Sequence, residues 1–177
     1  MRKGGGRVKG HTFENKVAKI LTGWSKVSWK RVPASGGWGS KDIASGDIFC
    51  AAEFDKKLSI IMPVSIELKK TQSWGFAHFF KDTDSSPVGS WWAQSTEDAK
   101  KSKKVPIVIF SKNYQPIFIM MATVTLDKLG VVAAERDAWK RFPQINCLVK
   151  GEAITVIKLE DFLSWISFES LLKLNLS

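Results

Sequence analysis

Two stretches decide the fold expected of this chain: Gly46-Asp47-Ile48-Phe49-Cys50-Ala51 and Pro63-Val64-Ser65-Ile66-Glu67-Leu68-Lys69. Residues 47–51 predict a short strand, residues 53–57 a polar turn, and residues 58–69 the returning strand of a hairpin. Charge on the returning strand is confined to its end, since the residues before it are apolar, proline or serine. The pattern therefore predicts a buried strand that delivers charged side chains at one edge of a sheet.

The register of this hairpin brings acidic side chains together. A turn at residues 55–57 places Asp47 opposite residues 65–67, with a one-residue slip allowed for a bulge at Pro63. Residues two apart on a strand point to the same face, so Glu67 and Lys69 lie together. An isolated acid-x-lysine pattern is also typical of a solvated strand end. Other segments of the chain favour a metal site instead.

The first of these segments predicts a helix over residues 12–24. Its apolar residues, which include Phe13, Val17 and Leu21, fall on one helical face, and Gly23 lies close to the helix end. Glu14 lies beside Leu21 at the border of that face, from where a carboxylate can reach inward.

Two more segments flank the expected hairpin. Residues 31–41 form a glycine-rich loop whose exposed amides suit a phosphate. After the hairpin, Trp91-Trp92-Ala93-Gln94 opens a predicted helix that runs into residues 100–104, four of them lysine, and then a strand over residues 105–110.

In this order, helix with Glu14, strand 26–32, Gly46-Asp47, Glu67-Leu68-Lys69, helix with Gln94 and strand, the chain resembles the PD-(D/E)XK nuclease superfamily. Within it, residues 7–125 are most similar to the archaeal-type and phage-encoded Holliday junction resolvases. The resemblance implies an α/β, restriction-endonuclease-like core with a mixed central β-sheet flanked by helices. The chain departs from the pattern at Gly46, which replaces the proline of the name, and in the long gap between Asp47 and Glu67. Residues 126–177 have no counterpart in it.

The resemblance also implies a metal site. Its ligands would be Asp47, Glu67, the carbonyl of Leu68 and Glu14. Elementary electrostatics agrees, because converging carboxylates repel one another and a divalent cation relieves this repulsion. Oxygen ligands suit Mg²⁺, and we expect Mn²⁺ to substitute for it.

The same resemblance assigns the remaining catalytic positions. Lys69 would orient the attacking water and stabilise charge on the phosphate. Ser35 would lie near the scissile phosphate, with Ser40 as the alternative, and Gln94 matches a polar helix position. The full catalytic set is therefore Glu14, Asp47, Glu67, Lys69, Ser35 and Gln94.

Composition favours a nucleic-acid partner. The 177 residues carry a net charge of +10 with a pI near 9.7, and residues 1–31 hold nine basic side chains against one acid. This is the distribution expected of a phosphate-binding protein, with residues 1–10 as a basic arm, although a solvated basic surface is the alternative. The DNA-contacting residues that we expect are Arg2, Lys3, Arg7, Lys9, Lys30, Arg31, Ser35, Trp38, Lys41 and Lys70.

The rest of the chain predicts one domain over residues 1–177. We expect a strand at 117–125, a helix at 133–142, a strand at 153–157 and an amphipathic helix at 159–174. The apolar surplus of this last helix favours a dimer surface within residues 126–177, and Trp74, Trp91 and Trp92 would line a groove or an interface.

Cysteine usage and hydropathy point to the cytoplasm of a prokaryotic or phage-infected cell. Cys50 and Cys147 lack metal spacing, so both are expected to be reduced thiols, and no apolar stretch is long enough to span a bilayer. The expected function is a magnesium-dependent endonuclease that resolves four-way DNA junctions by paired cuts as a homodimer. The alternatives are another PD-(D/E)XK nuclease, of restriction or repair type, and a non-catalytic DNA-binding module.

Overall fold

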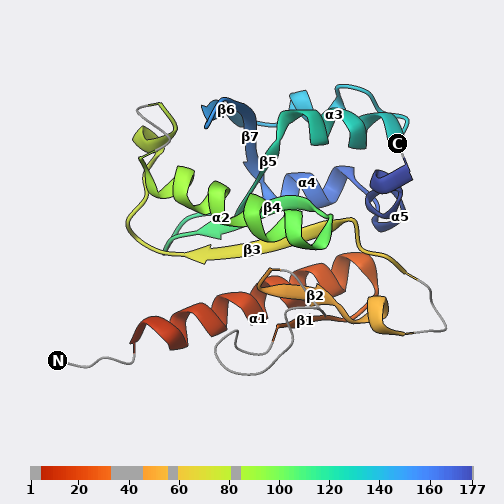
Figure 1. Cartoon of the computed structure of the whole chain (residues 1–177), viewed down its shortest axis with the longest axis horizontal. Helices are drawn as coiled ribbons and strands as arrows, with labels where there is room; N and C mark the ends of the chain where they lie inside the picture. Colours follow the sequence, from red (N-terminus) through yellow and green to blue (C-terminus); the bar gives the residue numbers. More distant parts are fainter. Residues whose placement is uncertain (1–4, 33–45, 56–59, 81–84, 177) are drawn as a thin grey trace.

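A seven-stranded mixed sheet between two helical layers forms the body of the protein (Figure 1). The computed structural model describes residues 5–32, 46–55, 60–80 and 85–176, with side chains from residue 11 to residue 174 within these ranges. No helix of this described part is long and apolar enough to cross a membrane. The mixed α/β fold agrees with the expectation from the sequence.

The strand order of the sheet is β1-β2-β3-β4-β5-β7-β6. β3 and β4 pair in parallel through the crossover helix α2, and the remaining pairs are antiparallel. The strands are β1 (Trp29–Arg31), β2 (Ile48–Cys50), β3 (Val64–Lys70), β4 (Val105–Ser111), β5 (Phe118–Ala122), β6 (Gln144–Val149) and β7 (Glu152–Lys158).

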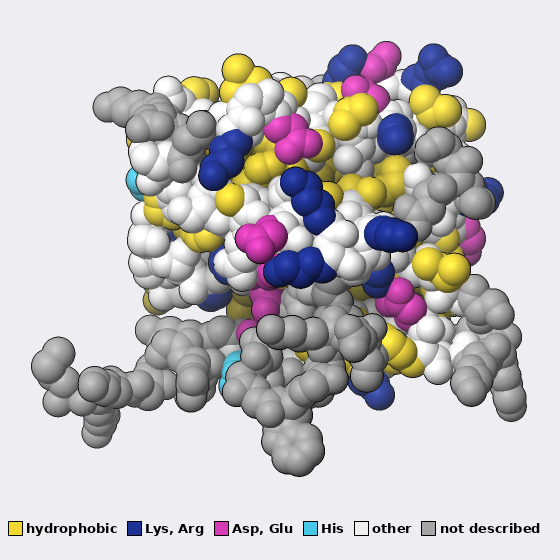
Figure 2. Space-filling view, viewed as in Figure 1, with side chains coloured by type: hydrophobic (Ala, Val, Ile, Leu, Met, Phe, Trp, Pro, Cys, Tyr) yellow, Lys and Arg dark blue, Asp and Glu magenta, His cyan; other side chains and the backbone are white. Residues whose placement is uncertain are grey.

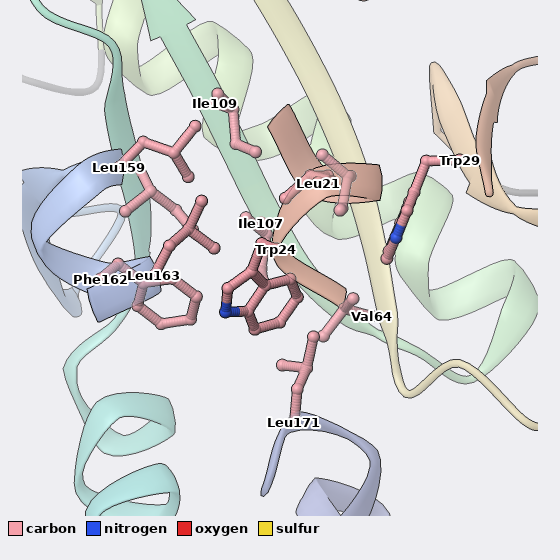
Figure 3. Close-up of a pocket in the computed structure, with 12 residues that line it drawn as sticks. Leu21, Trp24, Trp29, Val64, Ile107, Ile109, Leu159, Phe162, Leu163 and Leu171 are labelled. Carbon is pink, nitrogen blue, oxygen red and sulfur yellow. The ribbon is translucent and has the colours of Figure 1, made fainter. Parts of the chain in front are cut away.

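One face of the sheet is covered by four helices: α1 (Gly5–Ser25), α3 (Thr123–Val132), α4 (Leu159–Trp165) and α5 (Phe168–Leu172). The periodic residues Phe13, Val17 and Leu21 of α1 are buried there, as the sequence predicted. Trp24 closes the end of α1 by donating a hydrogen bond from its indole Nε1 to the carbonyl of Ile166, at 3.0 Å. Side chains from α1, β3, β4, α4 and α5 surround a small apolar cavity of about 20 Å³ (Figure 3).

The opposite face is covered by α2 (Pro87–Ser102) and by the short 3₁₀ helix η2 (Phe76–Phe79). α2 begins where Ser86 accepts a hydrogen bond from the amide of Gly89 and where Pro87 occupies the first turn, an arrangement that favours a helix start. It ends at Lys103, which adopts a left-handed conformation. Trp74, Trp91 and Trp92 are all buried in this core, so the expectation that they line a groove or an interface was wrong.

The returning strand of the hairpin is shorter than the sequence predicted. β3 begins at Val64, and residues 60–63 lie outside it. Proline has no amide hydrogen for a sheet ladder, which accounts for a strand that begins just after Pro63. Another 3₁₀ helix, η1 (Ala51–Phe54), replaces the first part of the polar turn.

The expectations for the C-terminal third were wrong in three places. The predicted strand at 117–125 ends at Ala122, and the helix follows at once as α3 rather than at 133–142, where a 3₁₀ helix, η3 (Ala138–Arg141), is found. Strand β6 was missed. The final helix is divided, because Ser167 caps a new helix, α5, and is followed by a 3₁₀ turn, η4 (Lys173–Leu176).

The division of the final helix changes the argument for a dimer surface. Phe162, Trp165 and Ile166 pack into the chain's own core, so the apolar surplus of this segment is accounted for within one chain. The basic arm also differs from its expected extent, since residues 5–10 already belong to α1.

Candidate active site

Asp47 lies at the start of β2, directly against β3. The register pairs Ile48 with Ile66, which sets Asp47 opposite Glu67, within the window predicted from the hairpin. The amide of Asp47 donates to the carbonyl of Ile66 at 2.8 Å, and its carboxylate Oδ2 accepts from the amide of Leu68 at 2.7 Å. Both the backbone and the side chain of Asp47 are therefore fixed to the strand that carries Glu67 and Lys69.

Position 46 is glycine where the superfamily name has proline, and its backbone conformation explains the difference. Its φ of +85° lies in the left-handed region, and a Cβ at this position would stand 2.3 Å from the carbonyl oxygen of Ile66. Proline holds φ near −65° and could not adopt this backbone. The tight approach to β3 thus requires glycine just before the acidic residue.

Glu67, Lys69 and Gln94 form a closed hydrogen-bonded group on the α2 side of the sheet. Lys69 Nζ lies 2.6 Å from Glu67 Oε1 and 2.9 Å from Gln94 Oε1, while Gln94 Nε2 donates to Glu67 Oε1 at 2.9 Å. Glu67 is only 5% exposed. In the described part of the chain both partners of Glu67 contact the same oxygen, Oε1.

Glu14 approaches from α1, on the other side of β3. Its Oε2 forms an ion pair with Nε of Arg31 from β1, and both side chains are partly buried. The next residue, Val32, donates its amide to the carbonyl of Asp47 at 2.9 Å. The end of β1 and the residue after it therefore hold both Glu14 and Asp47. The sequence analysis did not reveal this role, since it assigned Arg31 only a contact to DNA.

The pKa of Asp47 reflects both its burial and the acids that lie near it. Burial, followed by the charge of Glu67, raises the pKa of this carboxyl from its usual 3.8 to about 6. The Leu68 amide and Lys69 act in the opposite direction, and Glu14 contributes a small rise. A carboxylate in this setting gains from a bound cation.

The donors present fit a hard divalent cation, because Asp47, Glu67 and the Leu68 carbonyl offer oxygen only. Within the described ranges, no three Asp, Glu, His or Cys side chains are gathered closely enough to hold a metal by themselves. Two carboxylates, one backbone carbonyl and water suit Mg²⁺, which keeps several water ligands.

The basic residues expected to contact DNA are only partly placed. Lys30 is exposed on β1, and Lys70 ends β3 with its Nζ 5.7 Å from the ring centroid of Phe13. Burial, followed by the charge of Lys16, lowers the pKa of Lys70. Lys16, which the sequence analysis counted only among the basic residues of 1–31, therefore lies close enough to Lys70 to affect its charge.

Some predicted contacts lie outside the described residues: Arg2, Lys3, Ser35, Trp38, Ser40 and Lys41. Arg7 and Lys9 lie in α1, but their side chains are outside the described set as well. On the face shown in Figure 2, basic side chains alternate with acidic and hydrophobic ones. Among the described side chains on that face, the positive charge is therefore spread out.

His78 has a structural role and the two cysteines are free thiols, as expected. His78 Nδ1 accepts a hydrogen bond from the amide of Gly75 at 2.9 Å, which closes the η2 turn. Cys50 is buried and Cys147 partly buried, and both are free thiols whose pKa is raised by burial.

Comparison with known proteins gives one family and one relative. A family model described as "Phage putative PDDEXK endonuclease" matches residues 5–173. Protein D14 of Escherichia phage T5 is 26% identical over 107 residues, which are 60% of this chain and 64% of that protein. The matched stretch thus spans less than two thirds of the relative. No solved structure matches.

Proposed function

The chain belongs to the family of phage PDDEXK endonucleases, and we propose that it is a magnesium-dependent DNA endonuclease that cuts branched DNA. The observation that carries this proposal is the placement of Asp47 opposite Glu67 across β2 and β3, with Lys69 on the same strand end and Gln94 contacting Glu67 from α2. The raised pKa of Asp47 supports a cation at this point.

In the proposed site, Asp47, Glu67 and the carbonyl of Leu68 hold Mg²⁺, and Mn²⁺ can replace it. The cation supplies a Lewis acid for the phosphate and lowers the pKa of bound water. Asp47 has one carboxylate oxygen committed to the Leu68 amide, so the other oxygen is the proposed ligand. Glu14 completes the site through a water molecule, since Arg31 already engages its carboxylate.

Lys69 and Gln94 position the reacting groups. The Lys69 ammonium, held by Glu67 and Gln94, orients the attacking water and stabilises negative charge on the phosphate. Gln94 donates to Glu67 and accepts from Lys69, so it is bonded to both members of this ion pair and fixes their orientation. Ser35, which lies outside the described residues, is proposed to contact the scissile phosphate.

We propose four-way junctions as the substrate, cut at paired positions by a homodimer. One active site cuts one strand, so symmetric resolution requires two sites related by a two-fold axis. A net charge of +10 supports binding along DNA arms through their phosphates.

The proposal is tested with labelled linear, forked and four-way DNA, incubated with and without Mg²⁺. Glu67→Gln and Lys69→Ala should abolish cleavage while binding in Ca²⁺ persists, because binding depends on the basic surface. Glu97→Gln, an exposed acid on the same α2 helix as Gln94, serves as the control that keeps full activity.

Three outcomes separate the possibilities. Equal cutting of linear and branched DNA, or a monomer in sedimentation both free and on DNA, would remove the junction assignment and favour a restriction or repair type of nuclease. Tight binding without cleavage in Mg²⁺ or Mn²⁺ would make the chain a DNA-binding module.

A further inference from the structure

Three large aromatic side chains are exposed beyond the end of the sheet at which the proposed active site lies. Phe76 is 50% exposed on η2, Phe80 is 74% exposed just after it, and Tyr114 is fully exposed on the turn between β4 and β5. An exposed group of aromatic side chains is uncommon on a protein surface and marks a binding site.

The two segments that carry these residues are packed together. The ring of Phe76 meets Trp74 and Phe118 edge-on, at centroid distances of 6.0 and 6.3 Å. Lys112, from the turn that carries Tyr114, donates to the carbonyl of Trp74 at 3.3 Å and lies over its ring at 5.2 Å. Phe76, Phe80, Lys112 and Tyr114 are called the aromatic–lysine surface below.

This surface adjoins the proposed catalytic residues. Lys69 pairs with Phe110 on the neighbouring strand, and partners in a parallel pair share a face. The ring of Phe110 contacts Trp74 at 4.9 Å, and Trp74 in turn supports Phe76. On α2, Trp91 packs against Phe110 one turn before Gln94. Two ring contacts therefore connect Lys69 with the exposed edge of the surface.

Lys112 brings positive charge to this surface. It follows β4 and has no carboxylate partner in the described ranges. Lys70, at the end of the neighbouring strand β3, lies over Phe13 and belongs to the α1 face of the sheet. A lysine without a carboxylate partner beside exposed rings complements a ligand that has both phosphates and flat apolar faces, and single-stranded DNA has both. An apolar protein surface would leave the Lys112 ammonium without counter-charge.

We propose that the aromatic–lysine surface stacks unpaired bases of the DNA substrate beside the phosphate that is cut. Phe76 and Phe80 offer faces for the bases, and Lys112 binds the phosphates between them. The substrate class is then branched DNA, four-way junctions included, in which bases at the branch point are unpaired when the protein is bound. This inference rests on the proposed nuclease function, and it gives that site a means of telling branched DNA from duplex.

The test compares binding in Ca²⁺ of a fork with an unpaired arm and of a fully paired duplex of equal length. Phe76→Ala/Phe80→Ala should weaken binding of the fork by about 5- to 100-fold, the range expected for loss of base stacking. Binding of the duplex should change by less than about twofold. A 2-aminopurine in the unpaired arm should be quenched by the wild type and remain bright with the double variant.

Phe54→Ala is the matched control. Phe54 is 44% exposed and packs edge-on against Phe49 at 5.2 Å, much as Phe76 packs on Trp74, but it lies in η1, which leads away from β2. Its removal should leave both affinities and the quenching unchanged. Lys112→Met should also weaken binding of the fork more than of the duplex, because the phosphates that Lys112 binds lie between the unpaired bases.

An equal loss of fork and duplex binding in the double variant, or no loss at all, would overturn the inference. So would a wild type that binds the fork no better than the duplex. Loss of a dimer in sedimentation, with DNA binding unchanged, would assign the surface to a second copy of the chain. Failure of the nuclease proposal is seen separately, as absent cleavage in Mg²⁺ by a wild type that still quenches 2-aminopurine.

Discussion

Asp47→Asn should make the metal-free protein more stable at pH 8 while it removes the activity. A rise of the Asp47 pKa from 3.8 to about 6 corresponds to about 3 kcal/mol of unfavourable free energy when this carboxyl is ionised, because one pKa unit is worth about 1.36 kcal/mol. Asparagine removes the charge and keeps an oxygen that accepts from the Leu68 amide. Since its NH₂ group also needs a partner, we expect a net gain of about 1–3 kcal/mol.

The sign of this effect depends on pH. The folded protein takes up a proton on Asp47 below about pH 6, whereas the unfolded chain does so only near pH 3.8. The wild type therefore gains stability as the pH falls from 7 to 4, and the advantage of the variant should vanish over the same range. Mg²⁺ acts in the opposite direction, because at 100 times its dissociation constant a native-state ligand adds about 2.7 kcal/mol to the wild type alone.

Urea unfolding in EDTA and in Mg²⁺, at pH 8 and pH 4.5, measures all of these quantities. The expected gain at pH 8 corresponds to about 3–10 °C in melting temperature for a chain of this size. Glu97→Gln, whose side chain is 75% exposed, is the control and should change stability by less than about 0.5 kcal/mol. A metal-free Asp47→Asn protein that is less stable than the wild type at pH 8, or a gain that persists at pH 4.5, would refute the electrostatic reasoning.

Two further substitutions test the geometry of the site. Gly46→Ala should lower the free energy of unfolding in urea by about 2–4 kcal/mol, because a Cβ would clash with Ile66 and strain the backbone. Gly151→Ala, at a similar φ but in open space, should lower it by only about 1 kcal/mol. Equal losses in the two variants would contradict the close approach of Gly46 to β3. Gln94→Ala should lower the rate of DNA cleavage on the order of 10²-fold in single-turnover assays with little change in binding, because Lys69 loses the acceptor that positions it; an unchanged rate would remove Gln94 from the site.

The acidic pair could be predicted from the sequence because it depends on local structure. A hairpin has few registers that bury an alternating apolar face, so Asp47 had to meet β3 near Glu67. The face of α1 followed from its helical period in the same way. The ion pair of Arg31 with Glu14 depends on how α1 packs beside β1, which no pattern within either segment specifies.

The secondary structure of the C-terminal third was harder to predict, because its sequence patterns for helix and strand conflict. Leu126 and Leu129 fit the pattern of a helix, yet their helix begins at Thr123, directly after β5, with no turn residue between the two elements. β6 is an edge strand whose residues are half-buried or exposed, apart from the buried Val149, so its apolar pattern is weak. Lys150 and Gly151, both at positive φ between β6 and β7, form a two-residue hairpin turn, and the Lys-Gly pair was the one signal that could have revealed β6.

The hydrogen bond from the Leu68 amide to Asp47 gives the proposed site a spectroscopic reporter. This amide is held by a side chain that titrates near pH 6, so its proton chemical shift should follow the charge of the carboxylate, unlike an amide held by a backbone carbonyl. Its hydrogen exchange should be slow while Asp47 is ionised and faster once the carboxyl is protonated. A single backbone resonance can therefore show the protonation of the acid and its occupation by a cation, without DNA and without turnover.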